Sequence, residues 1–118
     1  MKPITTNYRI RKEKKKNKIL FYLDTDTCYK ASVIESYYDK DENRLHIIDL
    51  GTKEEYRGLG FASLLLKKMI GEAYRLRCRS ITLDDASDLF GQVMNIYLKF
   101  GFEYIVLGQP EMIKYLDI

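Results

Sequence analysis

A glycine-containing junction between a strand and a helix is the feature that most limits what this chain can fold into. The stretch Glu55–Ala62, EYRGLGFA, follows the apolar run LHIIDL at 45–50. After it, apolar side chains recur every three or four residues over 62–73, which is the spacing of one face of an amphipathic helix. The pattern predicts a strand at 45–50, a tight turn, and a helix that begins at about Leu59.

Runs of β-branched and aromatic residues between turn signals predict further strands. These are expected at 8–13, 19–23, 28–38, 80–83, 102–107 and 111–116. A second helix is expected over 84–100, with acidic residues at its start, where the helix dipole favours them, and with Gly101 as its stop. Gly51, at the end of the 45–50 strand, suggests a β-bulge or a close approach of backbone. This order of elements predicts an α+β fold built on a strand–helix–strand core.

The size and composition are those of one small domain, which we expect to span 1–118. Apolar residues make up 46% of the 118 residues, which is enough for a core. No run approaches the roughly 18 apolar residues of a membrane span, and the N-terminus lacks an apolar signal region. We therefore expect an intracellular, cytoplasmic protein that does not associate with membranes. With two cysteines and one histidine, no metal site is expected.

Basic residues are concentrated near the N-terminus. Residues 1–18 carry eight Lys or Arg and one Glu, whereas the rest of the chain has a net charge of −4. The run RIRKEKKKNK at 9–18 fits either a patch for nucleic acid or another polyanion, or a strand followed by a solvated turn. We expect no nucleic-acid binding, because the rest of the chain is acidic and no aromatic residues are interleaved in a basic stripe.

The start of the helix after the glycine turn is a candidate anion site. Its first backbone N–H groups have no partners within the helix, and the helix dipole places partial positive charge there. Gly58 and Gly60 lack the Cβ atoms that would keep a phosphate away, and Arg57 adds a charge. This arrangement suits a pyrophosphate. A P-loop is excluded because no Gly-Lys-Ser/Thr follows, and a dinucleotide fingerprint fits badly because Ser63 occupies its third glycine position. A tight turn without a ligand is the alternative.

Two motifs together resemble the GCN5-related N-acetyltransferase (GNAT) superfamily. The family's loop pattern, Gln/Arg-x-x-Gly-x-Gly/Ala, falls on 55–60, where both glycines match and the first position is Glu55. Its second signature resembles YLKFGF at 97–102. The likeness covers about residues 44–118. It implies an acyl-CoA N-acyltransferase (GNAT) fold with a mixed, mostly antiparallel sheet of about six or seven strands and two main helices. The family's usual first two helices are missing, because only EKKKNK separates the first two predicted strands.

The resemblance implies acetyl-CoA (coenzyme A) as the cofactor. Its pyrophosphate would bind the segment that contains Arg57, Gly58, Leu59, Gly60, Phe61, Ala62 and Ser63. Its pantetheine arm would pair with the backbone of Leu50, Gly51 and Thr52. The implied reaction is direct transfer of acetyl to a primary amine, which needs a deprotonated amine, donors for the oxyanion and an acid for the departing thiolate. The oxyanion donor is expected to be a backbone N–H near Leu50.

Tyr97 matches the family's acid, since its phenol can donate a proton to a thiolate. The alternative is a tyrosine that only fills the core, because Phe90, Val93 and Met94 share its predicted helical face. The two roles are compatible, since a buried tyrosine still needs a partner for its hydroxyl.

The base is less well defined by the resemblance. Ile48 stands where many relatives have a glutamate, so the candidate is Asp49, which would act through a water or bind a cationic acceptor. Further candidates are Glu35, Asp84 and Asp85, the last two of which also suit a helix start. The alternating pattern places His46 on the same strand face as Ile48 and Leu50, where we expect a half-buried histidine with its hydrogen bonds satisfied.

The acidic character of the chain outside 1–18 would attract a cationic acceptor. We expect a small di- or polyamine, with a protein lysine or N-terminal amine as the alternative. The missing helices normally wall the acceptor cleft, so we expect either an open cleft or a homodimer in which a second subunit supplies the wall. A CoA-binding module without catalysis is a further alternative, suggested by the missing glutamate.

Overall fold

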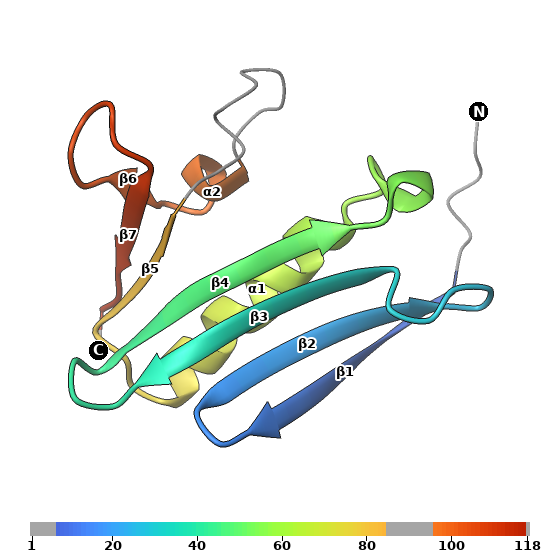
Figure 1. Cartoon of the computed structure of the whole chain (residues 1–118), viewed down its shortest axis with the longest axis horizontal. Coiled ribbons are helices and arrows are strands. Elements are labelled where there is room, and N and C mark those ends of the chain that lie inside the picture. The colour runs from blue at the N-terminus through green and yellow to red at the C-terminus, as the bar shows by residue number, and fades with distance from the viewer. Residues whose placement is uncertain (1–6, 85–95, 118) are drawn as a thin grey trace.

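The computed structural model describes residues 7–84 and 96–117, which form one seven-stranded sheet with two helices (Figure 1). The strand order is β1-β2-β3-β4-β5-β7-β6. The strands are β1 (Tyr8–Lys15), β2 (Lys18–Thr25), β3 (Ser32–Asp39), β4 (Arg44–Thr52), β5 (Ser80–Asp84), β6 (Glu103–Tyr104) and β7 (Glu111–Tyr115). The two helices are α1 (Phe61–Arg75) and α2 (Ile96–Lys99), and the 3-10 turn η1 (Glu54–Tyr56) precedes α1. None of these helices is both long and apolar enough to cross a membrane.

The sheet is mixed. β1 to β4 form an antiparallel meander, β4 and β5 pair in parallel, and β7 pairs antiparallel with both β5 and β6. The parallel pair needs a crossover connection, which α1 provides. A two-residue turn, Lys16–Asn17, joins β1 directly to β2. The α+β prediction and the missing first two helices are therefore confirmed.

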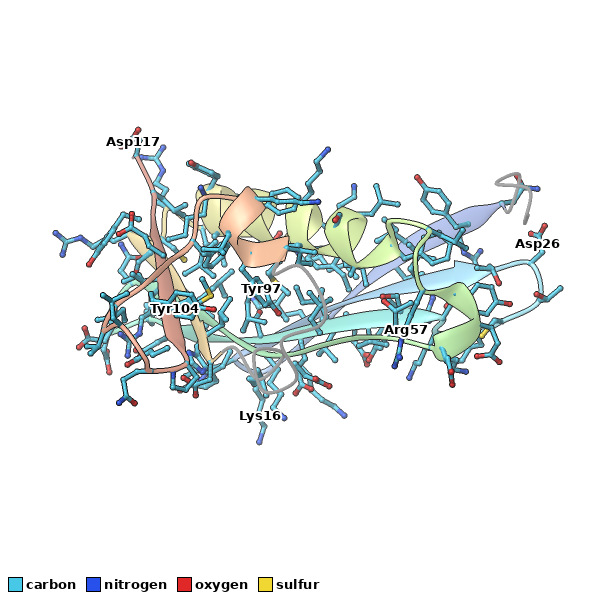
Figure 2. All side chains as sticks on the ribbon, turned by 90° about the horizontal axis from the view of Figure 1, so that it is seen from above. Lys16, Asp26, Arg57, Tyr97, Tyr104 and Asp117 are labelled. Atoms are coloured by element: carbon cyan, nitrogen blue, oxygen red, sulfur yellow. The ribbon has the colours of Figure 1, made fainter. Side chains whose placement is uncertain are left out.

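The core lies between α1 and one face of the sheet. Leu65, Leu66 and Met69 of α1 are fully buried, as are Ile34 and Leu45 on the facing strands. α2 packs against the same core through Ile96 and Tyr97, and Figure 2 shows both helices on one side of the sheet. We call the opposite side the outer face. In the described part of the chain no helix covers it (Figure 1).

Several predicted element boundaries are wrong. The strand expected from residue 28 begins at Ser32, because the buried Asp24 carboxylate accepts the backbone N–H of Lys30 at 2.9 Å and holds residues 28–31 in a loop. α1 begins at Phe61 and not at Leu59, because Gly60 adopts a left-handed conformation. The strand expected at 102–107 is reduced to Glu103–Tyr104, and a turn follows. Asp84 belongs to β5, and 85–95 lie outside the described residues.

A β-bulge interrupts β4 at Ile48. Ser36 of β3 pairs with Ile47 and Glu35 pairs with Asp49, so Ile48 has no partner in β3. The predicted bulge at Gly51 is therefore wrong, because that residue pairs regularly with Val33 of β3. A register shift of one residue exchanges the faces to which side chains point.

The bulge decides the direction of three side chains in β4. Leu50 pairs with the buried Ile34 and packs against the core. Ile47, three residues earlier, packs against the same core, although a regular strand would turn it to the other face. Asp49 faces outward together with its partner Glu35. His46, which precedes the bulge, lies on the outer face and not on the face of Leu50, so the prediction of a shared face is wrong for this pair.

The basic N-terminal segment is tied into the fold by ion pairs. Lys12 on β1 reaches the buried Glu72 of α1 at 2.8 Å, and Arg75 bonds the same carboxylate. On the outer face, Arg11 donates to Asp24 at 2.6 and 3.2 Å. Part of the predicted basic patch therefore joins β1 to its neighbours.

Candidate active site

β4 and β5 form a fork that begins at the bulge. Their parallel pairing runs from Arg44 opposite Ser80 to Ile47 opposite Leu83 and then stops, while β4 continues to Thr52. Beyond Ile47 the β5 side of β4 has no strand partner in the described part of the chain, and Figure 1 shows the two strands diverging. An extended ligand can hydrogen-bond to such an edge. The segment predicted to pair with pantetheine, Leu50 to Thr52, lies on this edge.

The loop after β4 presents backbone N–H groups at the start of α1. Gly58 and Gly60 have φ angles of 81° and 84°, which side chains disfavour. A Cβ at either position would meet no atom within 4 Å, so the backbone conformation and not crowding within the protein requires glycine. Gly60 supplies no side-chain cap. The first N–H groups of α1, those of Phe61, Ala62 and Ser63, therefore have neither a capping side chain nor an acceptor within the helix.

Arg57 and its neighbours fix the base of this loop. The Arg57 Nε donates to the Thr52 carbonyl at 3.0 Å, and its backbone N–H donates to Glu54 at 3.2 Å. Thr52 is held in turn by the Ser32 hydroxyl, at 2.8 Å between the two oxygens. The exposed guanidinium thus stands between the end of β4 and the start of α1, beside η1 in Figure 2. This position fits the predicted role of Arg57 beside a pyrophosphate.

Tyr97 lies half-buried in α2 and packs against the core. Its ring meets that of Phe102 edge-on, with 5.7 Å between centroids and 68° between planes. Its carbonyl accepts the N–H groups of Phe100 and Phe102, and Gly101, with φ of 91°, ends the helix as predicted. Figure 2 looks into the fork from above and shows Tyr97 between α2 and the strands. The packing role is therefore observed, and the acid role stays a prediction. Phe90, Val93 and Met94 lie outside the described residues.

The bulge assembles four polar side chains on the outer face beside the fork. Asp49 stands opposite Glu35, and His46 stands opposite Tyr37. Directly opposed side chains lie about 5 Å apart at Cβ, and neighbours two positions along a strand lie about 7 Å apart. We call these four residues the outer quartet. Lys18 forms an ion pair with Glu35 at 3.0 Å, whereas Asp49 is exposed.

His46 makes a hydrogen bond across the fork. Its Nδ1 lies 2.8 Å from the Thr82 Oγ1 on β5, one position before the parallel pairing ends. The half-buried histidine with satisfied bonding is thus confirmed in part, and its partner is a buried threonine. Thr82 and Tyr37 were not among the predicted site residues. Nothing local marks them, because only the strand pairing brings them to His46.

The other acidic candidates are placed differently. Asp84 is exposed at the end of β5, opposite Glu111 of β7. Asp85 lies outside the described residues. The structure therefore groups Glu35 and Asp49 with the β4 bulge and leaves Asp84 on the other arm of the fork.

The family model for the acetyltransferase (GNAT) family matches residues 6–102. The chain belongs to this family. It is therefore an N-acetyltransferase that uses acetyl-CoA. The fork, the glycine loop and the start of α1 are the parts of the fold that fit this cofactor, because they offer an unpaired strand edge and unpaired N–H groups. No curated protein sequence matches the chain.

Solved structures of other acetyltransferases share the fold. A GNAT acetyltransferase from Staphylococcus aureus Mu50 superposes with a TM-score of 0.73 at 16% identity, over 86% of this chain and 69% of that one. The PaiA N-acetyltransferase from Thermoplasma acidophilum, in complex with coenzyme A, gives 0.69 at 17% identity over 85% and 62%. The NatC complex bound to Gag peptide and CoA gives 0.68 at 21% identity over 83% and 71%. The chain thus spans about two thirds of their length.

Proposed function

We propose that this protein transfers the acetyl group of acetyl-CoA to a primary amine of a small di- or polyamine. The observation that carries the choice of acceptor is the outward turn of Asp49 at the β4 bulge, beside Glu35 and next to the fork. Two carboxylates facing each other across strands repel, and a bound cation relieves that repulsion. Lys18 neutralises part of Glu35, which leaves the exposed Asp49 to attract an ammonium group.

The chain's own groups would hold the cofactor along the fork. The N–H groups at the start of α1 and the Arg57 guanidinium would bind the pyrophosphate. The unpaired edge of β4 at Leu50, Gly51 and Thr52 would hydrogen-bond the pantetheine arm. A backbone N–H beside the bulge would stabilise the oxyanion. The cofactor supplies an activated acetyl thioester.

In this scheme one side chain would bind the charged acceptor and another would donate a proton to the leaving group. Asp49 would orient the cationic acceptor on the outer face by charge pairing. The Tyr97 hydroxyl would donate its proton to the thiolate when the carbon–sulfur bond breaks. The position of Tyr97 between α2 and the strands, beside the fork, supports this role (Figure 2).

A protein lysine or N-terminal amine is the alternative acceptor. The uncovered outer face favours it, because no described helix walls the side of the sheet on which Asp49 lies. The fold likeness to the NatC complex bound to Gag peptide points the same way. A homodimer in which a second subunit covers this face would favour the small amine instead. A cytoplasmic location suits either acceptor. Binding of CoA without catalysis is the third possibility.

An assay of acetyl-CoA-dependent thiol release tests the proposal. The acceptors are putrescine, spermidine, a lysine-bearing peptide and a peptide with a free N-terminus, all at one pH. Turnover on the diamine and polyamine alone supports the small-amine acceptor, whereas turnover on the peptides supports the alternative. No turnover with any of them, with CoA still bound, would leave a binding module.

The Tyr97→Phe variant tests the acid. We expect kcat to fall about 100-fold, the lower end of what a general acid contributes, with CoA affinity nearly unchanged. Tyr74→Phe is the matched control, because Tyr74 is an exposed tyrosine on α1. Equal kcat values in the two variants would show that Tyr97 is not the acid.

A further inference from the structure

We propose that His46 is the group that accepts the proton of the acceptor amine, and that Thr82 holds its ring in the orientation this requires. The inference rests on the proposed acetyl transfer and adds to it. The family resemblance favours Asp49, whereas the geometry points to His46, three residues earlier on β4.

The position of His46 is set by the fork. It stands on the last but one pair of the parallel β4–β5 ladder, so its side chain lies where the two strands begin to part. It points to the outer face, the same face to which the bulge turns Asp49. His46 and Asp49 stand opposite Tyr37 and Glu35, which are two positions apart on β3, so their Cβ atoms lie about 7 Å apart. An ammonium bound between the two side chains can contact both. Asp49 thus attracts the ammonium group, and the neighbouring His46 can take its proton.

The hydrogen bond to Thr82 occupies Nδ1 and leaves Nε2 as the nitrogen that can face a substrate. When Nδ1 carries the proton, its N–H donates a hydrogen bond to the Thr82 Oγ1, at 2.8 Å between the two atoms, and Nε2 keeps its lone pair. Thr82 is only 4% exposed, so this contact is shielded from solvent while the half-buried imidazole keeps an exposed part. A hydrogen-bonded partner of this kind fixes the angle of the imidazole ring.

Charged and titratable residues occupy outer-face positions on the strands near His46. They are Lys18 on β2, Glu35 and Tyr37 on β3, Arg44 and Asp49 on β4, Asp84 on β5 and Glu111 on β7. The four carboxylates outnumber the two cations, Lys18 and Arg44, and Lys18 is already paired with Glu35. Carboxylates at these positions suit a cationic acceptor rather than an anionic one.

The proposed step balances as a simple acyl transfer. The ammonium nitrogen gives one proton to the His46 Nε2, and its freed electron pair forms the C–N bond to the acetyl carbon. The C–S bond breaks with its electron pair on sulfur, and the Tyr97 hydroxyl protonates that thiolate. The acylated nitrogen releases its second proton to solvent, so the products are the neutral acetamide, CoA and one net proton. The proton on His46 returns through solvent to restore the tyrosine.

The chain has a single histidine, which makes the first test direct. In ¹H NMR the His46 Hε1 resonance is followed from pH 5 to 9 with saturating CoA, with and without putrescine. An ammonium beside the ring disfavours the imidazolium, so putrescine should lower the titration midpoint by about half a pH unit or more. The uncharged 1,4-butanediol should leave it unchanged. Superimposed curves with and without putrescine would overturn the proposal.

Kinetics of variants give the second test. His46→Gln keeps a side chain that can bond to Thr82 but cannot accept the proton, so kcat/KM should fall by about 100-fold or more. The acidic limb of the pH profile between pH 5 and 8 should also vanish, since imidazole titrates in that range. Calorimetry of CoA binding by each variant shows that the variant is folded. An unchanged kcat/KM, or an acidic limb that persists in His46→Gln, would overturn the assignment.

The threonine offers a matched pair of variants. Thr82→Val removes the hydroxyl at nearly constant volume and should cost about tenfold in kcat/KM, the value of one hydrogen bond. Thr82→Ser retains the hydroxyl and should stay close to wild type. Equal losses in both would refute the positioning role. Absence of wild-type turnover on every amine would instead refute the proposed function, and the NMR titration would still show whether an amine binds beside His46.

Discussion

Replacing Gly60 by alanine should weaken CoA binding through the backbone alone. Gly60 has φ of 84°, and a Cβ there would meet no atom within 4 Å. The substitution therefore introduces no clash, only the cost of a left-handed conformation at an L-residue, about 1–2 kcal/mol. We expect the free energy of unfolding to fall by that amount.

The effect on binding should be larger than this strain implies. If the chain relaxes toward negative φ, the N–H groups at the start of α1 turn away from the site. A hydrogen bond to a charged group is worth about 1.5–3 kcal/mol, so loss of one such bond would raise the Kd for CoA roughly 10- to 150-fold. Isothermal titration calorimetry measures this, and urea denaturation measures the change in stability.

Gly108 provides the matched control. It has φ of 85° and equally open surroundings, but it lies in the turn between β6 and β7, away from the start of α1. Gly108→Ala should lose the same 1–2 kcal/mol of stability while its Kd for CoA stays at the wild-type value. If Gly60→Ala weakens CoA binding no more than Gly108→Ala does, the glycine loop is not the pyrophosphate site.

Two further predictions concern buried groups. Hydrogen bonds from Arg75 and Lys12 hold the pKa of Glu72 below its ordinary value, so Glu72→Gln should unfold at lower urea than wild type above the unfolded glutamate pKa of about 4.3. This difference in urea midpoint should disappear as the pH falls through the lower pKa that Glu72 has in the folded state. Glu42→Gln, at an exposed glutamate, is the control. A difference that stays constant with pH would refute the role of the charge. Burial raises the pKa of the Cys78 thiol to about 11, so mass spectrometry should find the half-buried Cys28 alkylated first at pH 8, and prompt alkylation of Cys78 would contradict this.

Local sequence signals were sufficient for much of the fold. The spacing of apolar residues located α1, and the glycines located its start to within two residues, because a left-handed backbone has a strong residue preference. The YLKFGF stretch likewise marked the end of α2 at Gly101. These features depend on residues close together in the chain, and the family likeness is carried by the same stretches.

The outer quartet could not be predicted in this way. A bulge at Ile48 leaves no local trace, because isoleucine suits a regular strand and Gly51 was the more obvious candidate. Its place depends on the register with β3, which is a long-range property. The direction of Asp49 and the approach of Thr82 to His46 both follow from that register. The sequence therefore identified Asp49 as a residue of interest without showing why it can face a substrate.

Because both helices lie on one side of the sheet, neighbouring residues of one strand are under different constraints: some must fill the core, and others need only suit the solvent or a substrate. Ile47 and Leu50 belong to the packed interior, whereas Ile48 and Asp49 between them are exposed. Exposed substitutions usually change stability by less than about 0.5 kcal/mol. Acceptor preference could therefore diverge rapidly among relatives, or be redesigned in the laboratory, through residues on the outer face while the scaffold beneath them stays unaltered.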